Sequence, residues 1–355
     1  MRPETVYIVA VKRSEEEAAV AAARAGDQAA FSALSEPHRH ALRVHCYRML
    51  GSFDEAEDMV QETLLRAWRA RESFEGRSLL RTWLYRIATN VCLNALERAP
   101  QRLLPPDVAA PVTAQTPATQ ARSKPTTAPE LPWLQPYPDD LLEPAGAHEP
   151  ELALARQQSV ELAFLAALQH LPARQRAIVV LSDVLEWTAA EVAEQLELSV
   201  PAVTSSLQRA RASLRTELPA GREAWAPSLP LSDEQRAVLA GFVRAWETGD
   251  AGELTRLLRE DARWAMPPAP LWFQGRAAIE TLLRLFPPRW QGREFRMLPV
   301  GANRQPAAAA YLRQPGQTEF HFSGLHVLRV EGGQLAEITS FGPALCAGFR
   351  LPPTL

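Results

Sequence analysis

The chain has 355 residues, of which 46% are hydrophobic and 22% charged, and it carries a net charge of −3. This length accommodates two or three domains, and the composition is that of a globular protein. The near-neutral balance excludes a protein that binds nucleic acid through a uniformly basic surface, so any such contact must come from local patches.

The three cysteines, Cys46, Cys92 and Cys346, lie far apart and follow no metal-binding spacing. We therefore expect no disulfide framework, no metal site and no cofactor. The apolar run near the N-terminus is too short for a signal peptide, and no stretch is long enough to span a bilayer. These features predict a cytoplasmic protein without membrane attachment.

After a tail of residues 1–13, residues 14–98 are predicted to form a helical domain. The stretch Asp54–Trp68, DEAEDMVQETLLRAW, places apolar side chains at the spacing of one helical stripe, which alone indicates an ordinary amphipathic helix. The order of its residues resembles the helix with which group 4 (extracytoplasmic-function) sigma factors dock on the clamp helices of the RNA polymerase β′ subunit. That resemblance implies that the following residues contact core polymerase: Asp58, Gln61, Glu62 and Leu65.

The next helix, SLLRTWLYRIATNVCLNALER from Ser78, is predicted to bury one face made of Leu80, Trp83, Leu84, Ile87, Val91 and Ala95. Its polar face would ordinarily be solvated. With the preceding loop it resembles sigma region 2, which recognises and melts the −10 element, and unstacked bases are indeed read by aromatic stacking and hydrogen bonds. The resemblance implies −10 contacts by Phe74, Arg77, Arg86 and Asn90.

Residues 99–148 are predicted to be a linker, because twelve of the 30 prolines lie between Pro100 and Pro150. Within it the segment Pro132–Asp139, PWLQPYPD, is unusually rich in bulky aromatics, and it resembles linkers of sigma factors that carry an extra C-terminal domain. We expect it to dock on a neighbouring domain as a regulatory linker. The residues that would do so are Trp133, Leu134, Pro136, Tyr137, Pro138 and Asp139.

Residues 149–218 form a second predicted helical domain. It contains a helix-turn-helix pattern, with Thr188–Leu196, a turn at Glu197–Ser199 and a second helix Val200–Leu214. A polar-faced helical hairpin would give the same pattern. The run LPARQRAIVVLSDVLEWTAAEVAEQL resembles sigma region 4, which binds the −35 element, although a non-glycine residue at the turn would cost about 1 kcal/mol if held at positive φ. The implied −35 contacts are Thr204, Ser205, Gln208, Arg209 and Arg211.

A second Pro-rich linker, residues 219–231, leads to an α+β domain at residues 232–345 and a tail of residues 346–355. Three helices and a series of alternating strands are predicted, with a hairpin turn at Glu331–Gly333. This order and the phrase MPPAPLWFQGRAAI resemble the SnoaL-like, NTF2-fold cone with a curved antiparallel sheet. Side chains that could line the cone are Asp261, Trp264, Met266, Trp272, His321, His326 and Glu337. They include no acid–base pair whose placement the sequence supports, so no catalytic residue is predicted.

The predicted architecture is multidomain: two all-α sigma domains, the second a helix-turn-helix, followed by the NTF2-like cone. This order predicts a sigma factor that binds core RNA polymerase through its β′ clamp helices and β flap, recognises promoter DNA at the −10 and −35 elements, and is regulated in cis by the cone. The cone could take a small-molecule ligand. Two alternatives stay open: a helix-turn-helix repressor, and a SnoaL-type isomerase or cyclase fused to sigma modules.

Overall fold

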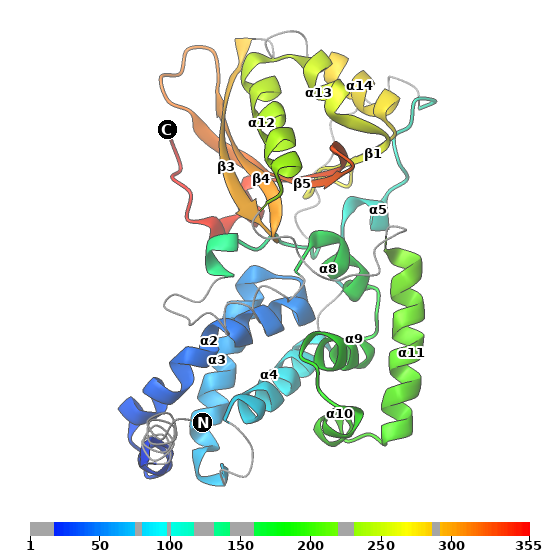
Figure 1. The fold of residues 1–355 in the computed structure, drawn as a ribbon. Coiled ribbons are helices and arrows are strands. Elements are labelled where there is room, and N and C mark those ends of the chain that lie inside the picture. The colour runs from blue at the N-terminus through cyan, green and yellow to red at the C-terminus, as the bar shows by residue number, and fades with distance from the viewer. Residues whose placement is uncertain are drawn as a thin grey trace, which may run out of the picture. The chain divides into compact units, whose positions relative to one another are not determined.

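A computed structural model describes residues 18–74, 80–97, 101–116, 131–142, 160–218, 231–285 and 292–355. Figure 1 shows the labelled elements. The chain divides into two units, and each is built from several separate stretches of the sequence. The first comprises residues up to Leu50, Asp54–Ala99 and Leu171–Ser213, and the second comprises Gly51–Phe53, Pro100–His170 and Leu214–Leu355.

The first unit is helical. Residues 18–24 are helical, and the elements that follow are α2 (Gln28–Leu50), α3 (Phe53–Arg69), the short η1 (Arg71–Ser73), α4 (Leu80–Leu96), α9 (Ala173–Val179), the π turn η3 (Val180–Val184), α10 (Ala189–Leu196) and α11 (Val200–Glu217). On α3 the buried residues Ala56, Val60, Thr63 and Ala67 follow the predicted stripe. The amphipathic pattern therefore places this helix correctly, with its acidic side outward.

The buried face of α4 differs from the predicted one. Trp83 and Ile87 are only half-buried, whereas Tyr85 and Thr89 are fully enclosed. The reason is that α4 packs on α2 and also on α9, so it buries more than a single stripe. A helix covered from two sides does not show its second contact surface as a simple period in the sequence.

The helix-turn-helix forms as predicted. The Thr188 hydroxyl accepts a hydrogen bond from the Glu191 N–H at 3.3 Å and caps the start of α10. Glu197 ends α10 in the left-handed conformation, with φ 54° and ψ 47°. The turn thus contains the non-glycine residue at positive φ that the sequence suggested, and Ser199 accepts a hydrogen bond from the Ala202 N–H at 3.3 Å inside the next helix.

The second unit contains the α+β domain. Its elements are α12 (Asp233–Thr248), α13 (Ala251–Leu257), β1 (Leu258–Ala265), β2 (Trp272–Gln274), α14 (Arg276–Leu285), β3 (Glu294–Ala302), β4 (Gln305–Arg313), β5 (His321–Glu331) and β6 (Gln334–Phe341). The sheet has the order β2-β1-β6-β5-β4-β3. The sheet is antiparallel as predicted except at one place, where β1 pairs with β6 in parallel. The connection through α14 separates β1 from the β3–β6 hairpins, and local patterns do not give the relative direction of strands so far apart.

One face of this sheet packs on α12, as Figure 1 shows. The core between them includes Phe242, Trp246, Trp264, Met297 and Ile338; Ala308 and Ala310 of β4 belong to the same cluster. The predicted hairpin turn is confirmed, since Gly332 and Gly333, both at positive φ, connect the paired residues Glu331 and Gln334.

Parts of the predicted Pro-rich linker are ordered within the second unit. They include α5 (Pro105–Val108) and η2 (Asp139–Leu141), and α8 (Leu162–Gln169) follows further along. Val112 pairs with β2: its N–H donates to the Trp272 carbonyl at 2.9 Å, and its carbonyl accepts from the Gln274 N–H at 3.0 Å. The proline-rich composition indicated a segment that does not fold alone, and here it folds by adding to a sheet.

The C-terminal segment is also ordered in the second unit, with η5 (Pro343–Leu345) and η6 (Ala347–Phe349). The backbone of Leu355 exchanges hydrogen bonds with that of Phe320, at 3.1 and 2.9 Å. Within the described ranges, no helix combines the length and the apolar character needed to cross a membrane.

Candidate nucleic-acid interface

Helix α3 presents a mixed polar and apolar stripe. Asp58, Gln61 and Leu65 are exposed and succeed one another at intervals of one helical turn. Leu65 keeps 43% of its surface accessible, although the opposite face of the helix is buried. Glu62 is half-buried and accepts a hydrogen bond from Arg66 at 2.6 Å. The four residues predicted to bind polymerase thus lie on the outer side of one helix.

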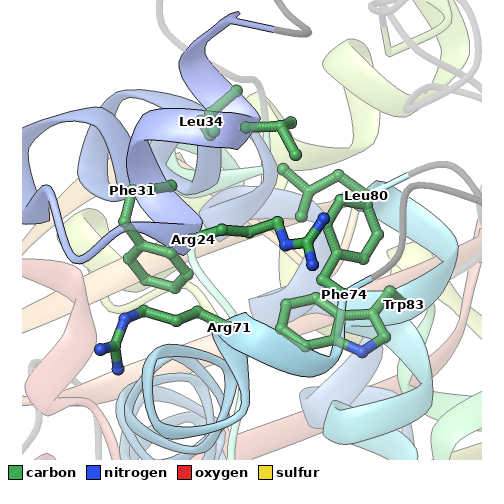
Figure 2. Close-up of a pocket in the computed structure, with 9 residues that line it drawn as sticks. Arg24, Phe31, Leu34, Arg71, Phe74, Leu80 and Trp83 are labelled. Atoms are coloured by element: carbon green, nitrogen blue, oxygen red, sulfur yellow. The ribbon is translucent and has the colours of Figure 1, made fainter.

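A pocket beside α4 contains the aromatic residue predicted to contact the −10 element. Phe74 is 7% exposed, and its ring lies 5.0 Å from that of Trp83. Figure 2 shows Arg24 extending toward the Phe74 ring and Arg71 extending beside the Phe31 ring. The lining residues are Val20, Ala23, Arg24, Phe31, Leu34, Arg71, Phe74, Leu80 and Trp83. The free space is about 20 Å³, the size of roughly one water molecule, so a base would enter only after these side chains move.

Sequence reasoning did not single out the two pocket arginines. Arg71 stacks over the Trp68 ring at 4.6 Å and donates a hydrogen bond to the Trp68 carbonyl at 3.2 Å. Arg24 donates to the Glu72 carbonyl at 3.4 Å. The i, i+3 spacing of Trp68 and Arg71 is a signal that could have identified the stacked arginine. Arg77, also predicted to contact DNA, lies outside the described residues.

The polar residues of α4 are in contact with α10. Arg86 forms an ion pair with Glu194. The Gln195 side-chain amide donates to the Arg86 carbonyl at 3.1 Å and to the Asn90 Oδ1 atom at 3.5 Å. The structure therefore brings the predicted −10 residues Arg86 and Asn90 against the first helix of the helix-turn-helix, although Asn90 remains exposed.

A buried polar network fixes α4 from its other side. The His45 ring Nε2 lies 3.0 Å from the Thr89 hydroxyl, which itself donates to the Tyr85 carbonyl at 2.8 Å. Burial, with a smaller contribution from the charge of Arg48, lowers the pKa of His45 to about 3. His45 is therefore neutral at physiological pH, where it orients α4 without adding charge to the surface.

The recognition helix α11 offers a polar surface. The predicted contacts Thr204, Ser205, Gln208 and Arg209 are all exposed, and Arg209 donates hydrogen bonds to the hydroxyls of Ser205 and Ser206 at 2.6 and 3.0 Å. Arg211 is exposed as well, but its guanidinium is held by both carboxylate oxygens of Asp183, at 3.0 and 2.5 Å. This pairing raises the pKa of Arg211.

The PWLQPYPD segment is enclosed within the second unit. Its members Trp133, Leu134, Pro136, Tyr137 and Pro138 are buried, and Asp139 is half-buried. On one side the Gln135 side chain accepts a hydrogen bond from the Ser52 hydroxyl at 2.9 Å, and the centroid of the Tyr137 ring lies 5.2 Å from that of Phe53. The aromatic residues that stood out in the sequence therefore form part of a core.

Tyr137 and Asp139 of the segment also contact the turn between β3 and β4. Tyr137 and Asn303 exchange two hydrogen bonds of 2.8 Å, one from the Tyr137 N–H to Oδ1 and one from the Asn303 N–H to the Tyr137 carbonyl. The Arg304 N–H donates to the Asp139 carboxylate at 2.7 Å. Asn303 and Arg304 both have φ 57°. The segment thus bonds both to residues 51–53 and to the β3–β4 turn, all of which lie within the second unit.

The interior of the cone is aromatic. The His326 ring stacks on Trp246 with centroids 5.1 Å apart, its Nδ1 lies 2.6 Å from the Ser340 hydroxyl, and the Trp264 indole donates to the same hydroxyl at 2.7 Å. Burial lowers the pKa of His326 to about 4. Of the predicted lining residues, Trp264 and His326 are here, and Met266 packs at the margin of this core.

The remaining predicted lining residues lie elsewhere. Asp261 and His321 are exposed, Glu337 pairs with Arg329 at 3.2 Å, and the Trp272 indole donates to the Ala109 carbonyl of the linker at 2.7 Å. The interior thus lacks an acid–base pair among those candidates. Over the described ranges, no cluster of three or more His, Cys, Asp or Glu side chains could hold a metal ion.

Comparisons with known proteins agree with this geometry. Residues 34–101 match the model of sigma-70 region 2, residues 161–214 that of sigma-70 region 4, and residues 239–338 that of a SnoaL-like domain. The chain is 44% identical over 333 residues to the extracytoplasmic-function RNA polymerase sigma factor SigG of Mycobacterium tuberculosis, covering 94% of this chain and 86% of that protein.

Two further relatives differ in extent. SigW of Bacillus subtilis is 30% identical over 194 residues, covering 54% of this chain and 91% of that protein. The crystal structure of the M. tuberculosis extracytoplasmic-function sigma factor SigJ superposes with a TM-score of 0.56 at 20% identity, covering 91% of this chain and 99% of SigJ. The likeness to SigJ shows a shared fold that extends over the C-terminal domain.

Proposed function

This chain belongs to the extracytoplasmic-function sigma factors of RNA polymerase and directs transcription initiation, and we propose that separate surfaces divide this work. Helix α3 docks on the β′ clamp helices of core polymerase, the α4 region captures the −10 element, and α11 binds the −35 element while its module contacts the β flap. The C-terminal cone regulates these activities in cis. The chain acts in the cytoplasm, where polymerase and promoter DNA are present.

The observation that carries the polymerase proposal is the exposed Leu65. Leu65 shares one helix face with Asp58 and Gln61. Protein interfaces commonly have this composition, in which an apolar anchor is surrounded by polar contacts. The carboxylates add electrostatic steering toward a basic partner surface. The rest of this face is free of buried apolar contacts, since the stripe of α3 that packs inside the unit is the opposite one.

For the −10 element, we propose that an unstacked base enters the pocket beside Phe74 and Trp83. Stacking on aromatic rings is worth about 1–3 kcal/mol per base, and the neighbouring Arg24 and Arg71 add positive charge for the backbone. The pocket widens on binding, because its present space of about 20 Å³ is far below the size of a base. Arg86 becomes available when its ion pair with Glu194 opens.

The test uses the full-length chain, core polymerase and a promoter found by mapping transcription start sites. The wild-type chain is expected to co-purify with core polymerase and to start transcription from a linear promoter. Leu65→Asp is expected to abolish both, with Arg66→Gln, an exposed residue of α3 about 100° around the helix from Leu65 that makes the same change of net charge, as the control for helix integrity and charge. A chain that binds promoter DNA but ignores the core enzyme would instead be a repressor, and the proposal would be withdrawn.

The cis-regulatory role of the cone rests on the PWLQPYPD segment. This segment joins the turn that precedes α3 to the β3–β4 turn of the cone through Gln135, Tyr137 and Asn303. A change in the cone can thereby reach residues 51–53, which belong to the same unit as the cone and precede Asp54 in the chain. Truncation after Leu218 and the point variant Tyr137→Ala are both expected to alter initiation rate. Unchanged transcription in both would exclude regulation in cis.

An isomerase or cyclase activity is not part of this proposal. The candidates for acid–base chemistry are dispersed, with Asp261 and His321 on the surface and Glu337 held by Arg329. His326 faces aromatic rings and a serine hydroxyl. This is the environment of a structural histidine in a core, with a hydrogen-bond partner for its ring nitrogen. We therefore assign the cone a structural and regulatory part in a sigma factor.

A further inference from the structure

The ion pair between Arg211 and Asp183 bears on whether Arg211 can contact DNA. Both guanidinium nitrogens Nε and Nη2 donate to the carboxylate, at 3.0 and 2.5 Å. A bidentate pair of this kind uses the planar fork of arginine, the same fork that would recognise a guanine or a phosphate. While the pair persists, Arg211 has neither the geometry nor the net charge of a DNA contact.

The position of Arg211 on its helix supports this reading. At about 100° per residue, Arg211 lies roughly 80° from the centre of the buried stripe formed by Val203, Ala210 and Leu214. Ser205, Gln208 and Arg209 lie about 120° or more from that centre, on the outer face. Arg211 therefore projects sideways along the edge of the packed face, toward η3, whereas Arg209 projects outward.

Asp183 lies on the turn that follows α9, where its carboxylate can restrain the position of α11. It belongs to the π turn Val180–Val184 at the end of α9, and its side chain is only 15% exposed, against 47% for Arg211. Val180 and Leu181 of the same turn are buried. The carboxylate is thus attached to a fixed part of the unit and constrains both the rotation of α11 about its axis and its distance from α9.

We propose that Asp183 and Arg211 act together as positioning residues for α11, and that Arg211 makes no contact with promoter DNA. This inference rests on the proposed −35 role of α11 and narrows its contact surface to the outer face that carries Arg209. The pair holds the helix at the angle at which that face can enter the major groove.

The test measures binding of reconstituted holoenzyme to a promoter duplex selected from random DNA by the wild-type holoenzyme, and to the same duplex with a scrambled −35 element. Affinity is recorded as a function of salt concentration for Asp183→Asn, Arg211→Gln, the double variant and the charge-swapped Asp183→Arg/Arg211→Asp. Arg209→Gln is the control for an arginine on the outer face. Thermal melting of each chain monitors the fold.

A positioning pair predicts that each single variant lowers −35-dependent affinity by about three- to tenfold and that the double variant loses no more than either. The slope of log K against log salt stays at its wild-type value in Arg211→Gln, whereas Arg209→Gln reduces it by about 0.9. The charge-swapped variant restores affinity, because the ion pair is rebuilt with the opposite polarity.

Two results would overturn the inference. One is a loss of about 0.9 in the salt slope for Arg211→Gln while Asp183→Asn binds as well as wild type, which identifies Arg211 as a phosphate contact. The other is a charge-swapped variant that melts like wild type and still binds weakly. If the wild-type holoenzyme does not distinguish the intact from the scrambled −35 element, it is the proposed −35 role that fails.

Discussion

Arg86 of α4 is ion-paired with Glu194 of α10, so an arginine expected to touch −10 bases is neutralised by a helix of the module expected to bind the −35 element. The pair is partly exposed, with 34% and 67% of the two side chains accessible, and such pairs contribute at most about 1 kcal/mol to stability. Its effect on DNA binding can exceed its effect on folding, because the carboxylate competes with phosphate for one guanidinium.

The first prediction follows from that competition. Glu194→Gln is expected to raise the affinity of the free chain for single-stranded −10 DNA by about two- to fivefold and to shift unfolding by less than about 1 kcal/mol. Fluorescence polarisation with a labelled oligonucleotide measures the affinity. Glu217→Gln, an exposed residue near the end of α11, makes the same change of net charge and serves as control. Equal gains in the two variants would mean that general charge, not release of Arg86, is responsible.

The second prediction concerns the turn of the helix-turn-helix. Glu197 is exposed and adopts φ 54°, where an L-residue with a Cβ is strained by about 1 kcal/mol relative to glycine. Glu197→Gly is therefore expected to stabilise the first unit by up to about 1 kcal/mol, read as an increase in melting temperature. Ala190→Gly, on the exposed face of α10, should destabilise it by a similar amount. A decrease in melting temperature for Glu197→Gly would contradict the turn geometry.

The third prediction tests the attachment of the PWLQPYPD segment. Asn303→Ala removes the acceptor for the Tyr137 N–H and the donor to the Val160 carbonyl, and it places alanine at φ 57°. Leaving buried groups unpaired costs about 1–3 kcal/mol each, so amide hydrogen exchange around residues 133–139 should accelerate at least tenfold. Asn303→Asp keeps the acceptor and should have a smaller effect. Exchange rates unchanged in Asn303→Ala would show that the segment is held by its aromatic contacts alone.

The fourth prediction is a pH dependence that originates in the cone. The pKa of His326 is about 4 in the folded chain, because burial disfavours the imidazolium, and about 6.5 when the chain unfolds. Between these values the unfolded chain binds a proton that the folded chain does not, so stability decreases as pH falls from about 6.5 to 4.

From pH 7 to pH 5 this difference amounts to about 2 kcal/mol. The measurement compares urea midpoints at the two pH values for wild type and His326→Asn, whose amide can still accept from the Ser340 hydroxyl. The variant should lose about 2 kcal/mol less than wild type over this interval. An identical loss in both chains would assign the acid sensitivity to other groups, such as His45.

Several features of the chain could be predicted from local sequence because their causes are local. The stripe of α3 follows from apolar spacing, and the cap at Thr188 and the hairpin at Gly332 follow from the residues that these positions require. Leu65, which the resemblance implies as a polymerase contact, is exposed on the face opposite this stripe.

The partners of the candidate site residues could not be predicted in this way. Arg86, Arg209 and Arg211 look equivalent as arginines on polar helix faces, yet one is paired with Glu194, one bonds serines on its own helix, and one is held by Asp183. The acidic partners of Arg86 and Arg211 are 108 and 28 residues away in sequence. Nothing in the local pattern of a helix records which distant carboxylate will meet its outer face.

The sequence by itself determined the modules, their order and the membership of the chain in the extracytoplasmic-function sigma factors, because these are encoded in runs of consecutive residues. Tertiary structure alone decided that β1 and β6 are parallel, that the proline-rich segment completes a core and that Arg211 is occupied by Asp183. Each of these depends on which elements meet in space. That choice is made by the burial of whole surfaces, not by the propensity of any one segment.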